Sequence, residues 1–419
     1  MSVDYKNFPE PQLDPVVNPR PKAGSGRPVI VAARRTPIGK FQGSLSEVPA
    51  PELGAAVARS ILQETGLASD LIDEVIFGCV LAAGQGQNPT RQVVIKSGMD
   101  PRVSAFTLNK VCASGLKSVA LASQAIRAGD MRAVLAGGME NMSRAPYLLD
   151  KARAGYRLGH GQMLDSMISD GLWDPYSDFH MGNTGELVAQ KYGLSRQQQD
   201  EYAYQSHQKA LAAIAAGKFK DEITPVQVPA GKGKFASFEV DECPRADTNP
   251  EALARLRPAF QKEGGTVTAG NAPGVNDAAA GLLVMDEEFA REQGLKPLAR
   301  ILDSYAGGLD PAWVMLTPIP SVRGLLKRNP DWKISDFNCI EINEAFSVQA
   351  LAVIQELGLD PARVNVHGGA VALGHPIGCS GARILVTLIH ALRQRGGGRG
   401  LATLCLGGGN GLALAVEVD

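Results

Sequence analysis

The stretch LNKVCASGL, residues 108–116, sets a cysteine, Cys112, directly before a predicted helix. Apolar residues follow it at helical spacing, among them Leu116, Val119 and Ile126, and a glycine ends the run. A cysteine at a helix N-terminus lies near the positive end of the helix dipole, which favours the nucleophilic thiolate over the thiol. We therefore expect a lowered pKa for Cys112. Taken alone, the stretch fits a buried structural cysteine better.

The pattern around this stretch recurs in the last third of the chain. An apolar run, the cysteine stretch and a second apolar run reappear there in the same order. The matching segments are 73–78 with 336–343, 112–118 with 379–385, and 133–138 with 401–408. Landmarks that recur in order predict an internal repeat, so we expect two similar halves.

Each predicted strand is nearly continuous in apolar residues, and predicted helices alternate with the strands. The runs at 28–33, 72–78 and 133–138 are of this kind, and 51–64 is a predicted helix. This pattern is typical of an α/β fold with a mostly parallel sheet that is covered on both faces. At 419 residues the chain is long enough for two or three domains.

The predicted domain boundaries follow changes in composition along the chain. From about residue 143 to 271 the sequence is more polar, with helices predicted at about 184–192 and from Ser195 to about 216, the second begun by a capping box with Gln198. We interpret this segment as an insertion over the sheet. The predicted parts are a flexible N-terminal arm (1–27), a first half (28–144 plus 272–295), an inserted loop domain (145–271) and a second half (296–419).

The composition argues against several classes of partner. The formal net charge is −1, so we expect neither nucleic-acid binding nor attraction to an anionic membrane. No apolar stretch reaches the roughly 18 residues of a membrane span, and residues 1–27 do not resemble a signal or transit peptide. The six cysteines contain no C-x-x-C pair, which predicts reduced thiols, a cytoplasmic location and no metal site.

The second half contains three motifs with polar residues near the ends of predicted strands and helices. His375 lies in GHPIG, residues 374–378, where the proline that follows it prevents a regular helix and holds it in a rigid loop. Asn343 follows an apolar strand, and a helix N-cap is the alternative interpretation. Cys405 precedes the glycines 407–409, where a tight turn with a buried cysteine is the alternative. Since ligands of α/β sheets bind at the carboxyl ends of strands, we expect these side chains to share one site.

Together these motifs resemble the thiolase family, and the resemblance covers residues 28–419. It rests on NKVCASG at 109–115, NEAF at 343–346, GHPIG at 374–378 and CLGGG at 405–409. The resemblance implies an α/β fold of two similar halves stacked as five layers, α-β-α-β-α, with an inserted loop domain in the first half. It also implies a homodimer or homotetramer that acts on coenzyme A (CoA) thioesters as substrates and needs no other cofactor.

The resemblance assigns a role to each catalytic residue. Cys112 resembles the acyl-accepting nucleophile, and His375 the base that activates it. Cys405 resembles a second acid and base, which removes the α-proton in condensation and returns a proton to the enolate in cleavage. Asn343, acting through a water, would form one oxyanion site with His375. The backbone amides of Cys112 and Gly407 would form the other.

The substrate pocket is also expected from the resemblance. Its predicted lining residues are His180, Met181, Met315, Ala272 and Phe346, together with Cys379 beside the His375 loop. The His-Met pair resembles the short-chain, acetoacetyl-CoA type. The chain departs from the family at Pro273, where many members have a serine that contacts the pantetheine, and at Ile342, where a smaller residue is common. Proline offers no donor, so that contact is lost or replaced.

The implied function is reversible condensation of two acetyl-CoA molecules to acetoacetyl-CoA and CoA, through an acetyl-cysteine intermediate, in lipid metabolism. A broader 3-ketoacyl-CoA thiolase of β-oxidation is the nearest alternative. A condensing enzyme with carrier-protein substrates fits less well, because such enzymes usually pair the cysteine with two histidines, or with a histidine and an asparagine. A zinc site or thiol sensor built from Cys112, His375 and Cys405 is the non-enzymatic alternative.

Overall fold

The structure, a computed structural model, describes residues 26–419, and its centre is a sheet of ten strands. The strand order is β14-β15-β16-β13-β1-β12-β5-β3-β4, and the short β2 pairs with β12. The strands are β1 (Pro28–Arg35), β2 (Gly39–Lys40), β3 (Glu74–Gly78), β4 (Ser104–Leu108), β5 (Ala133–Asn141), β12 (Asn276–Asp286), β13 (Ala299–Gly308), β14 (Phe337–Ile342), β15 (Gly398–Leu406) and β16 (Asn410–Val418). The predicted N-terminal arm lies, up to residue 25, outside the described residues.

The strand order is symmetric about the contact between β1 and β13. That contact is short, because only Val29 and Ile30 pair with Arg300 and Ala299. Counting outward from it, β12 corresponds to β16, β5 to β15 and β3 to β14. The predicted repeat of the strands is therefore confirmed, with each half of the chain supplying one half of the sheet.

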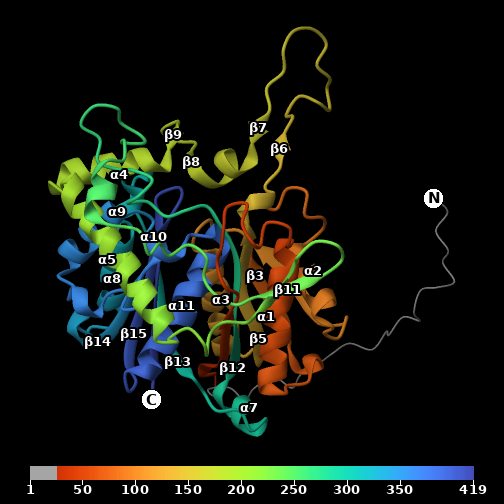
Figure 1. Cartoon of the computed structure of the whole chain (residues 1–419). Helices are drawn as coiled ribbons and strands as arrows, with labels where there is room; N and C mark the ends of the chain where they lie inside the picture. Colours follow the sequence, from red (N-terminus) through yellow and green to blue (C-terminus); the bar gives the residue numbers. More distant parts are fainter. Residues whose placement is uncertain (1–25) are drawn as a thin grey trace.

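Helices form the other layers of the molecule (Figure 1). Between the two halves of the sheet lie α3 (Ser114–Ala128) and α11 (Ile377–Gln394), and α11 is buried along almost its whole length. The first half is covered on its outer face by α1 (Ala50–Thr65) and α2 (Pro89–Ser97). The second half is covered by α8 (Pro318–Arg328) and α9 (Ser347–Leu357). The predicted α-β-α-β-α layering is confirmed.

The two central helices approach each other closely because glycines lie at their contact. A Cβ atom on Gly115 of α3 would lie 2.7 Å from the backbone nitrogen of Ala382 in α11. A Cβ atom on Gly381 would lie 2.5 Å from the backbone nitrogen of Leu116. Since α3 begins just after Cys112 and α11 just after His375, this contact also fixes where the two predicted catalytic residues lie.

The sheet is mixed, and the expectation of a mostly parallel sheet is wrong. The pairs β3–β4, β3–β5 and β14–β15 are parallel, whereas β5–β12, β12–β1, β1–β13, β13–β16 and β16–β15 are antiparallel. An apolar run predicts a strand buried on both faces but not its direction. Direction here depends on β12, which re-enters the sheet after the insertion, and on β16, which returns from β15 through a glycine turn. Neither was predicted as a strand.

The segment between β5 and β12 carries two helices at the predicted places. They are α4 (Met181–Tyr192) and α5 (Arg196–Ala215), and the capping box of Ser195 and Gln198 is present. Three short hairpins were not predicted: β6 (Tyr147–Leu148) with β7 (Leu164–Asp165), β8 (Trp173–Asp174) with β9 (Phe179–His180), and β10 (Val226–Pro229) with β11 (Phe235–Phe238). The β6–β7 hairpin projects away from the body of the molecule (Figure 1).

Short helices connect the main elements. They are η2 (Ser69–Leu71), η3 (Met142–Arg144), η4 (Ile168–Leu172), α6 (Pro250–Ala254), α7 (Glu287–Glu292), η5 (Pro311–Leu316), η6 (Ile334–Asp336), η7 (Pro361–Arg363) and α10 (Ala370–Leu373). Over residues 26–419, no helix has both the length and the apolarity needed to cross a membrane.

Candidate active site

The predicted site residues converge on one cavity of 190 Å³ between the two halves. Four of the five predicted catalytic residues line it: Cys112, His375, Cys405 and Gly407. All five predicted substrate-binding residues line it as well: His180, Met181, Met315, Ala272 and Phe346. The fifth catalytic residue, Asn343, is fully buried and contacts the ring of His375.

Cys112 is held at a sharp backbone turn before α3. The preceding residue, Val111, has φ of 47°, which is uncommon for any non-glycine residue and rare for a β-branched one. Local hydrogen bonds hold this turn: Val111 N donates to Asn109 Oδ1 at 2.9 Å, and Ser114 Oγ donates to Val111 O at 2.7 Å. Strain of this kind costs about 1–3 kcal/mol and persists only where the surrounding structure imposes it. Here it aims the cysteine at the cavity.

The pKa of Cys112 is raised, so the expectation of a lowered value is wrong. Burial in the cavity raises it to about 12, although the backbone amides of Gly407 and of Cys112 itself donate toward the sulfur and oppose that rise. α3 begins only at Ser114, and desolvation outweighs its dipole. The resting residue is therefore a thiol, and it needs a base at the moment of reaction. The same two amides are the predicted oxyanion donors.

His375 is placed in a loop between α10 and α11. Its backbone nitrogen donates to Asn276 Oδ1 at 2.8 Å, and the preceding glycine has φ of 110°. Ser380 Oγ donates to Pro376 O at 2.9 Å and lies 2.6 Å from the ring Nδ1, so it accepts the Nδ1 proton. This arrangement leaves Nε2 unprotonated and able to act as a base.

The imidazole of His375 is neutral in the resting protein. Burial, together with a smaller effect of the nearby positive charge of Arg383, lowers its pKa to about 3. A neutral imidazole next to a thiol can take the thiol proton as a general base. The cavity therefore combines an uncharged nucleophile with an uncharged base.

Cys405 lies at the end of β15 on the wall of the same cavity. Burial raises the pKa of its thiol, and the neighbouring Cys112 raises it further, so the two sulfurs share one electrostatic environment. The turn that follows requires glycine at Gly408 and Gly409, whose φ angles are 82° and 75°. A Cβ atom on Gly409 would also lie 2.4 Å from Leu309 O.

Asn343 points its side-chain amide at His375, with Nδ2 3.4 Å from Nδ1. Its Oδ1 is buried and has no hydrogen-bond partner among the described residues. The helix-cap alternative for Asn343 is wrong, because α9 is capped by Phe346 and Asn343 makes no cap hydrogen bond. A buried amide with an unpartnered oxygen beside the catalytic histidine fits a residue that acts through a small polar ligand such as water.

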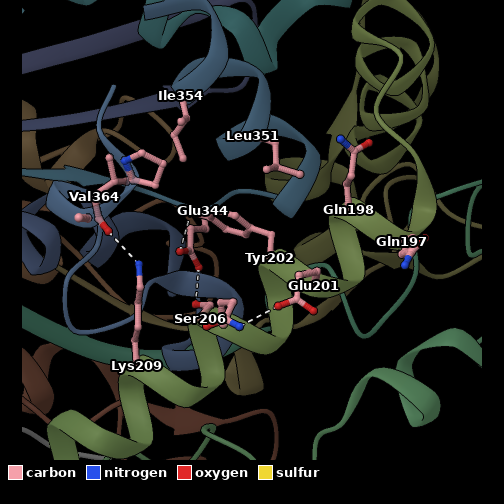
Figure 2. A pocket seen from close by; sticks show the side chains of 13 residues that line it. Gln197, Gln198, Glu201, Tyr202, Ser206, Lys209, Glu344, Leu351, Ile354 and Val364 are labelled. Carbon is pink, nitrogen blue, oxygen red and sulfur yellow. Dashed lines mark hydrogen bonds between the residues drawn. The ribbon is translucent and has the colours of Figure 1, made fainter. Parts of the chain in front are cut away.

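The position of Asn343 is stabilised by its neighbour Glu344, whose carboxylate receives hydrogen bonds from two helices. Tyr202 Oη and Ser206 Oγ of α5 donate to it at 3.0 Å and 2.8 Å (Figure 2). The backbone nitrogen of Val371 in α10 donates to it at 2.9 Å. Helix α5 of the insertion thus stabilises the NEAF segment through these hydrogen bonds. Glu344 also lines a groove of 650 Å³ between α5 and α9.

Aromatic rings form one side of the cavity. His180 stacks on Phe260, with ring centroids 4.8 Å apart, and Phe260 meets the edge of Phe346 at 6.3 Å. Burial lowers the pKa of His180, so this ring is also neutral at physiological pH. The two methionines Met181 and Met315 add flexible apolar surface.

Of the three other residues singled out beside the motifs, Cys379 has a different place from the expected one. Cys379 does not line the cavity; it is fully buried in the α3–α11 core, since its helix turn faces Gly115 rather than the substrate. Ile342 is buried in β14 under α9. Pro273 does line the cavity, in agreement with a position where the family has a substrate contact.

Several site residues were missed from the sequence. Ser380, Asn276, Phe260 and Glu140 contact or support the predicted residues, but each lies far along the chain from its partner or carries no distinctive motif. Only Ser380 had a usable signal, because it follows His375 by five residues in the first turns of a predicted helix. Over residues 26–419, no group of three or more His, Cys, Asp or Glu side chains is arranged to hold a metal ion.

Comparisons with known proteins match nearly all of the described chain. Residues 28–288 match the model of the thiolase N-terminal domain, and residues 295–418 that of the thiolase C-terminal domain. An acetyl-CoA acetyltransferase of Pseudomonas aeruginosa is 56% identical over 391 residues, which cover 93% of this chain and 99% of that protein. An acetyl-CoA acetyltransferase of Escherichia coli (strain K12) is 54% identical over 390 residues, 93% and 98% of the two chains.

A solved structure resembles the fold closely. The crystal structure of the Bacillus anthracis acetyl-CoA acetyltransferase superposes with a TM-score of 0.91 at 44% sequence identity. The match covers 94% of this chain and 99% of the other.

Proposed function

Because the chain belongs to the thiolase family, we propose that it condenses two acetyl-CoA molecules reversibly to acetoacetyl-CoA and CoA. The observation that carries the proposal is the single cavity shared by two thiols and a neutral imidazole, with two backbone amides directed at one of the thiols. One thiol can hold the acyl group while the other moves the substrate proton. A single thiol cannot do both.

In the first half-reaction Cys112 attacks the thioester carbonyl of acetyl-CoA. His375 Nε2 takes the thiol proton as the carbon–sulfur bond forms. The negative charge that develops on the carbonyl oxygen is stabilised by the backbone amides of Cys112 and Gly407. Collapse of the tetrahedral intermediate breaks the bond to the CoA sulfur, which leaves with the proton from His375. The products are acetyl-Cys112 and CoA.

In the second half-reaction the Cys405 thiol passes its proton to His375 Nε2 in the same cavity, and the resulting thiolate removes a proton from the α-carbon of a second acetyl-CoA. The enolate oxygen is stabilised by His375 and by Asn343 acting through a water, the role that its buried unpartnered oxygen supports. The enolate carbon then attacks acetyl-Cys112, and the bond to the Cys112 sulfur breaks to release acetoacetyl-CoA. The Cys112 sulfur takes the proton from His375, so both cysteines end as thiols and the imidazole is neutral again. Cleavage follows the same steps in reverse.

The cavity volume supports a short acyl chain. Its 190 Å³ is closed by Met181, Met315, Phe346 and the His180–Phe260 pair. A broader 3-ketoacyl-CoA thiolase is not favoured, because a long chain would require these lining side chains to move. We expect kcat/KM for thiolytic cleavage to be far higher for the C4 substrate than for the C8 substrate. Equal values would assign the chain to the broad type.

A variant of Cys405 tests the division of labour between the two thiols. Cys405→Ser should still exchange labelled CoA into acetyl-CoA, because exchange needs only Cys112 and His375. It should lose condensation and acetoacetyl-CoA cleavage, because both need the second proton carrier. Loss of exchange and condensation to the same extent would contradict the proposed roles.

Assembly, location and cofactor use are further parts of the proposal. Two features support a homodimer or homotetramer. Strand β4 is an edge strand of the sheet and exposes Phe106, and the projecting β6–β7 hairpin exposes Leu158. Six free cysteines in the described residues, two of them needed as thiols, support a reducing cytoplasm. The steps above use CoA thioesters as substrates and need no other cofactor, and the reaction belongs to lipid metabolism.

A further inference from the structure

Glu140 is a fully buried carboxylate that the proposed reaction steps do not use. It lies near the end of β5, and its two oxygens accept hydrogen bonds from three backbone amides. Val80 N donates at 3.0 Å, Leu81 N at 3.1 Å and Gly378 N at 2.9 Å. The thiol of Cys79 lies 3.6 Å from it. No solvent reaches the carboxylate, so its charge depends on these donors.

These donors come from both halves of the molecule. Val80 and Leu81 follow β3 in the first half, whereas Gly378 lies in the first turn of α11 in the second half, three residues after His375. A negative charge at this place favours the N-terminus of the 18-residue α11, whose first amides have no partner within the helix. The carboxylate therefore caps α11 from the other half.

Close packing leaves no freedom at this contact. A Cβ atom on Gly378 would lie 2.7 Å from Glu140 Oε2 and 2.8 Å from Met139 O. A Cβ atom on Gly138 would lie 2.1 Å from Gly378 O. The first turn of α11 thus lies directly against β5, and the carboxylate fixes the position of that turn. The His375 loop enters α11 at this turn.

The titratable groups that face Glu140 are three thiols. They are Cys79 after β3, Cys112 before α3, and Cys379 in α11. Burial raises the pKa of each thiol, and the negative charge of Glu140 adds to that rise. Burial raises the pKa of Glu140 itself to about 7, against the lowering effect of the three amides. The carboxylate is thus connected to both catalytic residues, to His375 through the backbone and to Cys112 through its charge.

We propose that Glu140 is a positioning residue of the acyl-transfer reaction, which ties the first turn of α11 to the segment after β3 and so holds His375 in place over Cys112. The inference rests on the proposed function for its kinetic consequence. Its electrostatic consequence, that the charge of Glu140 disfavours the Cys112 thiolate, does not depend on that function.

Two substitutions separate these consequences. Glu140→Gln keeps the size but removes the charge and replaces one acceptor oxygen by an amide group, which cannot accept from the backbone. Glu140→Asp keeps the charge, but its side chain is one methylene shorter, so the carboxylate lies farther from its backbone donors. Asp286→Asn is the matched control, because Asp286 is also a buried carboxylate that accepts amides at a helix N-terminus, at α7, where it contacts no catalytic residue.

Both Glu140 variants should lose kcat by about a hundredfold with KM for acetyl-CoA nearly unchanged, since a displacement of about 1 Å has effects of this size. The control should keep wild-type kcat. Thiolate absorbance, measured against pH as a difference from the matching Cys112→Ser protein, should give a lower midpoint for Cys112 in Glu140→Gln and an unchanged midpoint in Glu140→Asp.

The proposal is overturned if both variants keep kcat within twofold of wild type. It is also overturned if they lose kcat only in proportion to lost thermal stability, with the Cys112 midpoint unchanged in Glu140→Gln. Where Glu140→Gln does not fold, the kcat and KM of Glu140→Asp decide. The thiolate titration uses no substrate, so a normal midpoint shift in a protein without acyl transfer would contradict the proposed function alone.

Discussion

At the scale of single residues, the catalytic thiol and imidazole are both neutral before the reaction begins. Burial raises the pKa of Cys112 to about 12 and lowers that of His375 to about 3, so proton transfer between them is unfavourable in the empty cavity. The transfer becomes productive only when the thiolate is consumed by bond formation and the new oxyanion receives the waiting amides. A helix dipole alone would have predicted a preformed thiolate, which the surroundings of Cys112 do not support.

The oxyanion role of Asn343 is tested by Asn343→Ala. The alanine removes the polar atoms beside His375 without filling more space. We expect kcat to fall about a hundredfold, since loss of one such donor costs about 3 kcal/mol of barrier. Exchange of CoA into acetyl-CoA should fall much less, because it uses the other oxyanion site. An equal loss in both assays would contradict the assignment.

Burial of neutral His375 predicts a specific dependence of stability on pH. In the unfolded chain its pKa returns to the ordinary value of 6.5, well above the folded value of about 3. Between these values only the unfolded chain binds the proton, so folding weakens as pH falls, by up to about 1.4 kcal/mol per unit. His375→Asn should lack this loss. Urea unfolding at pH 7 and pH 5 measures it, and parallel behaviour of the two proteins would contradict a neutral buried histidine.

At the scale of elements, the contact between α3 and α11 fixes the distance between nucleophile and base. Each helix begins just after one catalytic residue, and glycines let their backbones touch. The sequence predicted both helices, and it predicted that they occupy equivalent positions in the two halves. It did not predict that Gly115 and Gly381 face each other, because that depends on how the halves stack.

Gly115→Ala tests this contact. Its Cβ atom would lie 2.7 Å from Ala382 N, so the helices must separate. We expect a loss of about 1–3 kcal/mol in stability together with a large loss of kcat. The control is Gly98→Ala at the end of α2, where φ is 78° but nothing lies near. It should cost about 1–2 kcal/mol and leave kcat unchanged. Equal kcat values for the two variants would contradict the role of the contact.

At the scale of the whole molecule, the site exists only where the two halves meet. Cys112 comes from the first half, and His375, Asn343, Cys405 and Gly407 come from the second. The insertion closes the cavity with His180 and Met181 and supports Asn343 through Glu344. The two halves therefore have similar folds, but they contribute different catalytic residues.

Assembly is tested by a charge at the open sheet edge. Phe106 lies on β4, which among the strands of residues 26–419 pairs only with β3. If copies of the chain associate along this edge, Phe106→Lys should lower the molar mass found by size exclusion with light scattering. A monomeric wild-type protein would contradict the proposed assembly.

The sequence was informative where chemistry requires particular residues in a short stretch. The GHPIG loop, the cysteine before α3 and the glycine turn after Cys405 could be recognised because proline restricts the backbone locally and glycine permits conformations that other residues avoid. Strand direction, the pKa of Cys112, and partners such as Ser380, Asn276 and Glu140 could not. They depend on burial and on contacts between residues far apart in the chain, which periodicity does not encode.

The central claim is that Cys112 carries the acyl group. Protein incubated with acetyl-CoA labelled in the acetyl group, quenched in acid and digested, should give one labelled peptide, the one that contains Cys112. The label should be lost on addition of CoA and should be absent from Cys112→Ser, which should remain folded. Label on another peptide, or normal turnover of Cys112→Ser, would contradict the account.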